Sequence, residues 1–202
     1  MKHFILSCLA AAFLLTACNS NKSKETTNDD AAKEKTEAER SSDNMSTKSA
    51  DDVQARLEEM RKLPALSTDQ IKAMLPQELA GMKRSSFSAN SAMGYGIGEA
   101  KYKSEDGEKS MKLVVYDCVG DAGAGLYTMM FWGWNMERED ENGYEKTTTF
   151  DGGKAIEKYQ KSQDEYSLTF PASNRLLVHI EGEKTGLDAL KQAASSLNLK
   201  TN

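Results

Sequence analysis

Two pairs of segments that alternate apolar and polar residues, each interrupted by an Asp-Gly turn, most constrain what this chain can fold into. The first pair, residues 99–103 and 110–118, flanks Asp106-Gly107. The second pair, residues 145–150 and 154–159, flanks Asp151-Gly152-Gly153. Alternating segments joined by such a turn are typical of β-hairpins, because Gly accepts the positive φ that the turn requires. The sequence therefore predicts an antiparallel sheet.

Two further segments at residues 83–89 and 165–170, the second of them alternating, and a short apolar run at residues 175–180 predict three further strands. An apolar stretch over residues 123–136 separates the earlier strands from the later ones and is expected to be a helix. The order of strands, helix, strands and a final helix favours an α+β fold. We expect an antiparallel sheet of about six to seven strands with the helices packed on one face, preceded by a disordered tether.

Three other helices are predicted from apolar spacing and capping residues. Apolar residues repeat at helical spacing over residues 51–62. Ser67, followed three residues later by Gln70, forms a capping box that begins a second short helix. Thr185, followed by Asp188, is expected to cap the last helix.

The first 17 residues have the pattern of a secretory signal peptide. Lys2 gives a basic start, and residues 4–17 form a nearly unbroken apolar run. This run is too short for a bilayer core, which needs roughly 20 residues. It is followed directly by Cys18.

The four residues Leu15-Thr16-Ala17-Cys18 resemble the lipobox of bacterial lipoproteins. The resemblance covers residues 1–18 and implies diacylglycerol on the Cys18 sulfur, cleavage before Cys18 and acylation of its new amino group. Two or three acyl chains give durable membrane attachment. No Asp follows Cys18, so the sorting pattern of the family favours the outer membrane of a bacterial cell envelope, with the domain facing the periplasm or the cell surface.

Residues 19–50 contain no Val, Ile, Leu, Phe, Trp or Tyr. Such a segment cannot bury enough apolar surface to offset its ordering entropy, so we expect a disordered tether. A flexible coil of this length spans roughly 30 Å, enough to hold a domain clear of a membrane. The expected organisation is a cleaved signal peptide at 1–17, a lipidated Cys and tether at 18–50, a helical lead-in at 51–80 and a globular domain at 81–202.

The densest apolar cluster spans residues 126–134 and includes both Trp residues of the chain. Met and aromatic side chains suit adaptable binding surfaces. Three interpretations are open: a buried core helix, a groove for an apolar ligand or partner, and a membrane contact. The candidate ligand-binding residues are Tyr127, Met130, Phe131, Trp132 and Trp134.

Two other motifs are weaker. The Gly-rich run at residues 94–98 is not followed by a helix or a P-loop Lys, which argues against nucleotide binding. It indicates a mobile loop or a strand that another segment approaches closely. The acidic run at residues 137–141 is expected to be a solvated loop; Ca²⁺ binding is the alternative, although the spacing of the acids does not match a calcium loop.

Cys118 and His179 are the thiol and the imidazole left after removal of the leader and acylation of Cys18. We expect Cys118 to be a buried apolar residue at a strand end, with a Cys118–His179 nucleophilic pair as the alternative. No other catalytic motif is present, so we expect no catalytic residue, metal or cofactor. The net charge of −5 argues against nucleic acid as a partner.

Residues 151–159, a Gly-Gly turn followed by Ala-Ile-x-x-Tyr, resemble an element of PsbP-like and uncharacterised bacterial envelope domains. The resemblance supports a sheet-containing domain and transfers no site residue.

Together these features predict a membrane-anchored envelope lipoprotein whose domain is a non-enzymatic binding or interaction module. The expected partners are the membrane, through the lipid on Cys18, and an envelope protein or an apolar small molecule. Two alternatives are an enzyme with an unrecognised active site and a carrier of an apolar ligand in a groove near Tyr127–Trp134.

Overall fold

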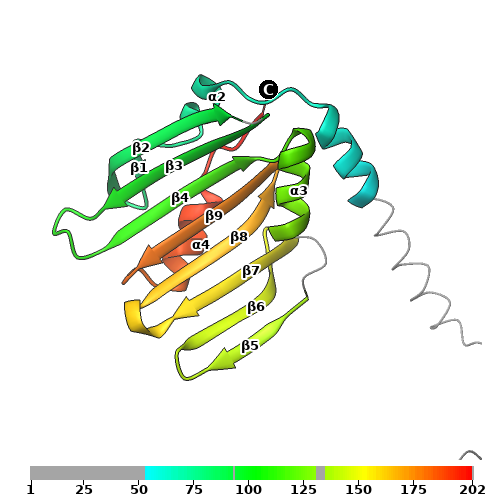
Figure 1. The fold of residues 1–202 in the computed structure, drawn as a ribbon. Helices are drawn as coiled ribbons and strands as arrows, with labels where there is room; N and C mark the ends of the chain where they lie inside the picture. Colours follow the sequence, from blue (N-terminus) through cyan, green and yellow to red (C-terminus); the bar gives the residue numbers. More distant parts are fainter. Residues whose placement is uncertain (1–52, 93, 131–134, 202) are drawn as a thin grey trace, which may run out of the picture.

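A nine-stranded antiparallel sheet dominates the computed structural model, which describes residues 53–92, 94–130 and 135–201 (Figure 1). The strand order is β1-β2-β3-β4-β9-β8-β7-β6-β5. The strands are β1 Glu78–Leu79, β2 Met82–Ala92, β3 Tyr95–Lys103, β4 Ser110–Asp117, β5 Glu137–Asp140, β6 Gly143–Phe150, β7 Gly153–Gln160, β8 Glu165–Ala172 and β9 Leu176–Glu183.

The sheet consists of two meanders that meet at its centre. Strands β1 to β4 pair in chain order, and so do β5 to β9. The chain passes from one meander to the other through helix α3, Gly120–Met130, and the two are joined where β9 pairs with β4. A local hairpin pattern therefore builds each half, whereas the β4–β9 pairing is a long-range contact.

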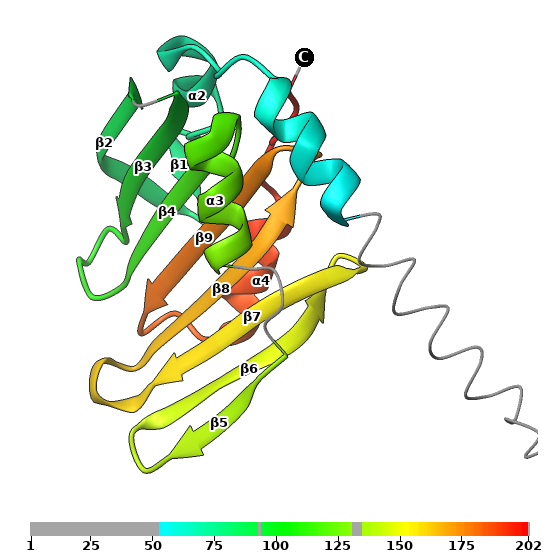
Figure 2. The ribbon, with the colours of Figure 1, turned by 45° about the vertical axis from the view of Figure 1, so that its right-hand side comes forward.

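Helices lie on both faces of the sheet, as Figures 1 and 2 show. Helix α2, Thr68–Ala73, and helix α4, Leu187–Ser195, cover one face and enclose the larger core. Helix α3 and a helix at residues 53–62 lie on the other face, above a smaller core. The larger core includes Ile71, Leu75, Leu113, Val115, Leu168, Ile180 and Leu190, and the smaller core is Leu57, Met60, Cys118, Ala124, Tyr127, Ile156 and Leu177.

The predicted fold class was wrong. The structure is a sheet-rich fold with nine strands and few helices, not an α+β sheet of six to seven strands with helices packed on one face. The sequence did not reveal β1, which has two residues, or β5, whose four residues are all charged and exposed. An edge strand without a buried face has no apolar alternation to detect.

The predicted hairpins are confirmed. Asp106-Gly107 lies in the turn between β3 and β4, and Asp151-Gly152 lies in the turn between β6 and β7. Asp151 and Gly152 have φ values of +50° and +75°. Positive φ at both central residues is the feature that makes Asp-Gly favourable in a two-residue hairpin turn.

One predicted helix cap is confirmed and another was wrong. Ser67 and Gln70 form the capping box of α2, with the Gln70 N–H donating to Ser67 Oγ at 3.2 Å and the Ser67 N–H donating to Gln70 Oε1 at 2.9 Å. The cap of α4 is Gly186, which makes no side-chain capping bond. The Thr185 hydroxyl instead donates to Ser110 O and Glu183 O, at the end of the sheet.

The Gly-rich run forms the start of β3, which confirms the interpretation as a strand with a close approach. Gly96 and Gly98 face α2, and a Cβ at Gly96 would overlap the Ile71 side chain. A Cβ at Gly98 would lie 2.6 Å from Ile71 Cγ2. Glycine therefore lets α2 pack directly onto the β3 backbone.

We expect Gly98→Ala to lower the free energy of unfolding by about 1–3 kcal/mol, because the added methyl overpacks the contact between α2 and β3. Urea denaturation measures the change. Gly125→Ala is the matched control, because its Cβ would meet nothing within 4 Å and alanine favours a helix. Equal stability of the two variants would contradict the packing described here.

Candidate functional site

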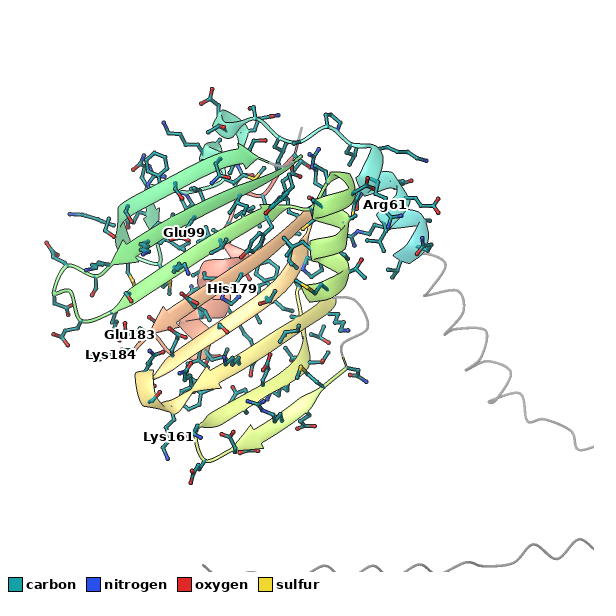
Figure 3. All side chains as sticks on the ribbon, viewed as in Figure 1. Arg61, Glu99, Lys161, His179, Glu183 and Lys184 are labelled. Atoms are coloured by element: carbon teal, nitrogen blue, oxygen red, sulfur yellow. The ribbon has the colours of Figure 1, made fainter. Side chains whose placement is uncertain are left out.

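Among the described residues, α3 and the helix at residues 53–62 cover only part of their sheet face, and polar side chains lie on the rest of it. Leu177 and Ile156 pack beneath the helices on this face. Side chains two residues apart in a strand share a face, so His179 and Lys158 also lie on it. Figure 3 shows His179 near the middle of this face.

The strand register aligns charged side chains into a row across the open face. We call this set the charged row; from β3 to β5 it consists of Lys101, Lys112, Glu181, Ser167, Lys158, Glu145 and Arg138. Its members come from seven strands and both meanders, so only the complete sheet assembles it. Opposite charges face each other on β4 and β9, on β6 and β7 and on β5 and β6, which favours this register, whereas Lys101 and Lys112 are like charges and Ser167 is neutral.

His179 links a hydroxyl to a carboxylate within this surface. Its Nδ1 lies 2.8 Å from Thr169 Oγ1, and its Nε2 lies 3.2 Å from Glu181 Oε2. The Glu181 carboxylate accepts hydrogen bonds only, so Nε2 carries a proton. In the neutral ring, Nδ1 then accepts the hydrogen bond of the Thr169 hydroxyl. Lys112 Nζ completes the group, 3.4 Å from Glu181 Oε1.

A cavity of about 510 Å³ opens beside this group, at the C-terminal end of α3. We call it the His179 pocket; its lining residues are Met129, Glu145, Ile156, Lys158, Glu165, Ser167, Thr169, His179 and Glu181. Met129 and Ile156 give it an apolar side, and the Met129 side chain is 65% exposed. An exposed thioether next to a hydrophobic wall and a polar rim is the composition of a small-molecule site.

Two glutamates of the His179 pocket are in opposite electrostatic states. The hydrogen bond from His179 and the charge of Lys112 lower the pKa of Glu181, although burial opposes the shift. Burial raises the pKa of Glu165, and the negative charges of Glu181 and Glu183 add to the effect. The charge of Glu181 is therefore compensated, whereas Glu165 is the group that a bound cation would stabilise.

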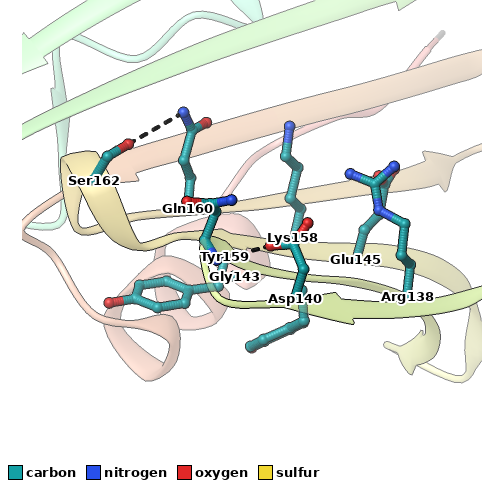
Figure 4. A pocket seen from close by; sticks show the side chains of 10 residues that line it. Arg138, Asp140, Gly143, Glu145, Lys158, Tyr159, Gln160 and Ser162 are labelled. Atoms are coloured by element: carbon teal, nitrogen blue, oxygen red, sulfur yellow. Dashed lines mark hydrogen bonds between the residues drawn. The ribbon is translucent and has the colours of Figure 1, made fainter.

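A second hollow, of about 400 Å³, lies farther along the same face between β5 and β7 (Figure 4). Lys158 and Gln160 point to the same side of β7 there, and Gln160 Nε2 donates to Ser162 Oγ at 3.5 Å. Glu145 and Lys158 line both hollows and form the rim between them. The second hollow is strongly polar and lacks the apolar wall of the His179 pocket.

The structure places only part of the predicted aromatic site. Tyr127 is buried in the smaller core, where the Arg56 guanidinium lies 5.2 Å from its ring centroid. Met130 ends α3, and its side chain lies outside the described residues, as do Phe131, Trp132, Trp134 and the lipidation residue Cys18. Met129, from the same apolar stretch, is the residue that reaches the His179 pocket.

The structure does not join Cys118 to His179. Cys118 is buried at the end of β4, as expected, and its thiol contacts the Tyr116 carbonyl oxygen at 3.8 Å. Burial raises the pKa of the Cys118 thiol to about 12, and the charge of Asp117 adds to this. A thiol in that state is protonated and poorly nucleophilic at neutral pH.

Thr169, His179 and Glu181 have the chemical composition of a nucleophilic triad, but not its setting. Thr169 is buried at 9% exposure in the centre of the sheet. The residues around it pair with β7 and β9. Their backbone N–H groups are therefore hydrogen-bonded within the sheet and do not form an oxyanion hole. The arrangement is better suited to binding than to acyl transfer.

The acidic run predicted as a loop is the edge strand β5, so its side chains alternate between the two faces. Among the described residues, no group of three or more His, Cys, Asp or Glu side chains could hold a metal ion. Apart from His179, which was considered only as a partner of Cys118, the polar residues of β8 and β9 were missed in the sequence. Their signal was present as alternation at Glu165, Ser167 and Thr169, and at His179 and Glu181.

The sequence matches no protein-family model and no curated protein. Among solved structures, a GTP binding regulator from Thermotoga maritima resembles this chain at 16% sequence identity and a TM-score of 0.31. The match covers 63% of this chain and 84% of the other. A likeness this weak carries no argument about fold or function.

We expect Glu165→Gln to raise the melting temperature at pH 7. The folded protein raises the pKa of Glu165, so the ionised carboxylate destabilises the fold at pH values above that folded pKa. The gain should shrink as the pH falls through the raised folded pKa, and vanish below the unfolded pKa. Thermal denaturation across this pH range measures it. The exposed Glu105→Gln is the control, and an equal gain in that variant would contradict the assignment.

Proposed function

We propose that this protein is a lipid-anchored, non-enzymatic binding module of a bacterial envelope. Its His179 pocket takes a small molecule, or a side chain of a partner, that combines an apolar body with a cationic group. The observation that carries the proposal is that one cavity pairs an apolar wall with the Glu165 carboxylate. Burial and two neighbouring glutamates raise the pKa of Glu165, and the charges of Lys158 and His179 offset this only in part.

The anchoring part of the proposal rests on the lipobox-like Leu15-Thr16-Ala17-Cys18, which lies outside the described residues. Within the described part of the chain, no helix has the length and apolarity needed to cross a membrane. Acyl chains on Cys18 would supply the attachment. The tether expected at residues 19–50 would then separate the sheet domain from the bilayer.

The ligand class follows from the balance of charge in the His179 pocket. Lys112 and His179 compensate Glu181, and Lys158 lies across from Glu145 in the β6–β7 register. Glu165 instead faces two other glutamates, so an ammonium group placed beside it would relieve their repulsion. Met129 and Ile156 would contact the apolar part of the same ligand.

We expect Cys18→Ser to abolish lipid labelling and to move the protein from the membrane fraction to the soluble fraction. Serine lacks the thiol to which diacylglycerol is transferred. Metabolic labelling with a fatty acid, followed by membrane fractionation, tests this. Cys118→Ser is the matched control and should stay lipidated, whereas membrane association of Cys18→Ser would contradict the anchor.

We expect the His179 pocket to bind benzylamine about threefold to fivefold more tightly than benzyl alcohol, and benzoate least. A partly exposed ion pair with Glu165 contributes about 0.2–1 kcal/mol. Titrations followed by NMR shifts at Ser167, Thr169 and His179 give the affinities.

Glu165→Gln should remove the preference for the amine, and Met129→Ala should weaken both the amine and the alcohol. Glu105→Gln should change neither affinity, because Glu105 is exposed in the β3–β4 turn. Tightest binding of benzoate, or shifts confined to other surfaces, would overturn this ligand class.

A further inference from the structure

Within the described residues, the outer side of β2 is unpaired over most of its length. β1 pairs only with Met82 and Lys83 at the start of β2. The Arg84 N–H then donates to Gln77 O at 2.9 Å. From residue 85 to residue 92, no residue in the described part of the chain pairs with the side of β2 that faces away from β3.

This edge lacks the features by which sheets usually block strand addition. Residues 85–92 contain no charged residue and no proline. The opposite edge of the sheet, β5, is four residues long, and all of them are charged and exposed. Short, charged edge strands resist pairing with other chains, and long uncharged ones permit it. The two edges of one sheet are therefore built differently, and β2 is the open one.

The register identifies the backbone groups that β2 offers. The Arg84 N–H points outward, to Gln77. A bulge between Arg84 and Ser86 adds one residue and shifts the alternation by one position. Beyond the bulge, Phe87, Ala89 and Ser91 present their N–H and C=O groups outward, while Ser86, Ser88 and Asn90 bond to β3.

The side chains beside this edge favour a bound segment in which an apolar residue is flanked by carboxylate side chains. Phe87 is 45% exposed, on the face that carries α2. The Arg84 guanidinium lies 4.5 Å from its ring centroid, and Lys72 Nζ lies 5.4 Å from it. Lys101 is exposed on the other face of neighbouring β3, where its Nζ lies 3.8 Å from Glu99 Oε1, so the unshared positive charge is that of Lys72 and Arg84. Apolar contact area and positive charge are thus available side by side.

The same charges disfavour a second copy of this chain as the occupant. An antiparallel pair of two β2 strands centred on Phe87 would bring two Phe87 rings together. The Lys72 and Arg84 of both copies would then gather around them, without a carboxylate from β2 to balance four positive charges. Like charges on paired strands are destabilising.

We propose that the outer edge of β2 is a strand-addition site for an extended acidic segment of a partner protein. The segment pairs with the backbone of Phe87, Ala89 and Ser91 and places an apolar side chain against the Phe87 ring. Asp or Glu side chains on the same face of the segment as this apolar residue lie near Lys72 and Arg84. Main-chain hydrogen bonds supply affinity in such complexes, and the side chains supply selectivity. This surface is separate from the His179 pocket, which β2 does not line.

The test uses the full-length protein in detergent and a short, capped, fluorescein-labelled peptide. Every second residue of the peptide is threonine, and the residues between them are valine and aspartate in turn, so that valine and aspartate share one face of the added strand. A matched peptide carries lysine in place of aspartate. We expect fluorescence anisotropy to give about tenfold tighter binding of the acidic peptide, because charge complementarity sets selectivity at such a surface. Hydrogen exchange should slow at the amides of Phe87, Ala89 and Ser91 when the acidic peptide binds.

Two variants separate the backbone contribution from the charge contribution. Ser91→Pro removes one outward N–H without touching the ladder to β3, and should weaken the acidic peptide about fivefold. Lys72→Ala leaves the backbone intact and should weaken it about threefold. Two control variants should bind the acidic peptide as tightly as the parent protein does. They are Ser88→Ala, at a residue whose N–H faces β3, and Lys161→Ala, at an exposed residue far from β2.

Equal affinity for the two peptides, or unchanged exchange at the three amides, would overturn the proposal. Slowed exchange of these amides with rising protein concentration alone, together with dimers in analytical ultracentrifugation, would assign the edge to a second copy instead.

Discussion

The buried ion pair of Asp117 and Arg175 is the contact on which the arrangement of this domain depends. Asp117 ends β4 and Arg175 directly precedes β9, so the pair lies where the two meanders meet. Arg175 donates to both carboxylate oxygens of Asp117, at 2.7 Å and 2.8 Å. The Leu66 N–H also donates to Asp117, at 2.7 Å, and Arg175 donates to Pro64 O at 2.6 Å. Asp117 and Arg175 therefore connect the β4–β9 junction at the centre of the sheet to residues 64–66, which cross the end of the sheet.

Residues 63–67, which cross the end of the sheet, explain why the helices lie on both of its faces. The helix at residues 53–62 precedes them and lies with α3, whereas α2 follows them and packs on the opposite face. Nine strands span about 38 Å at their usual spacing, and a helix covers about 10 Å. Two short helices cannot cover a face this wide. In the described part of the chain, the charged row and the His179 pocket lie outside the area that the two helices cover, and no strand pairs with the outer side of β2 from residue 85 to residue 92.

The sequence predicted what depends on neighbours along the chain. The alternating strands, the Asp-Gly hairpins and the Ser67 capping box are each encoded within a few residues, and all are present. It failed where the deciding contact is distant or the strand has no buried face. The charged edge strand β5 looked like a loop, and Thr185 looked like a cap because its sheet partner, Ser110, is far away in the sequence.

By itself, the sequence determined that the sheet is antiparallel, because alternation and hairpin turns are properties of local composition and period. The tertiary structure alone decided that β4 pairs with β9. That pairing places Lys112 beside Glu181, and the β8–β9 register places Thr169 beside His179. Residues this far apart in the chain share no local pattern. The charged row, which is assembled across seven strands, can therefore be recognised only when the strand order is known.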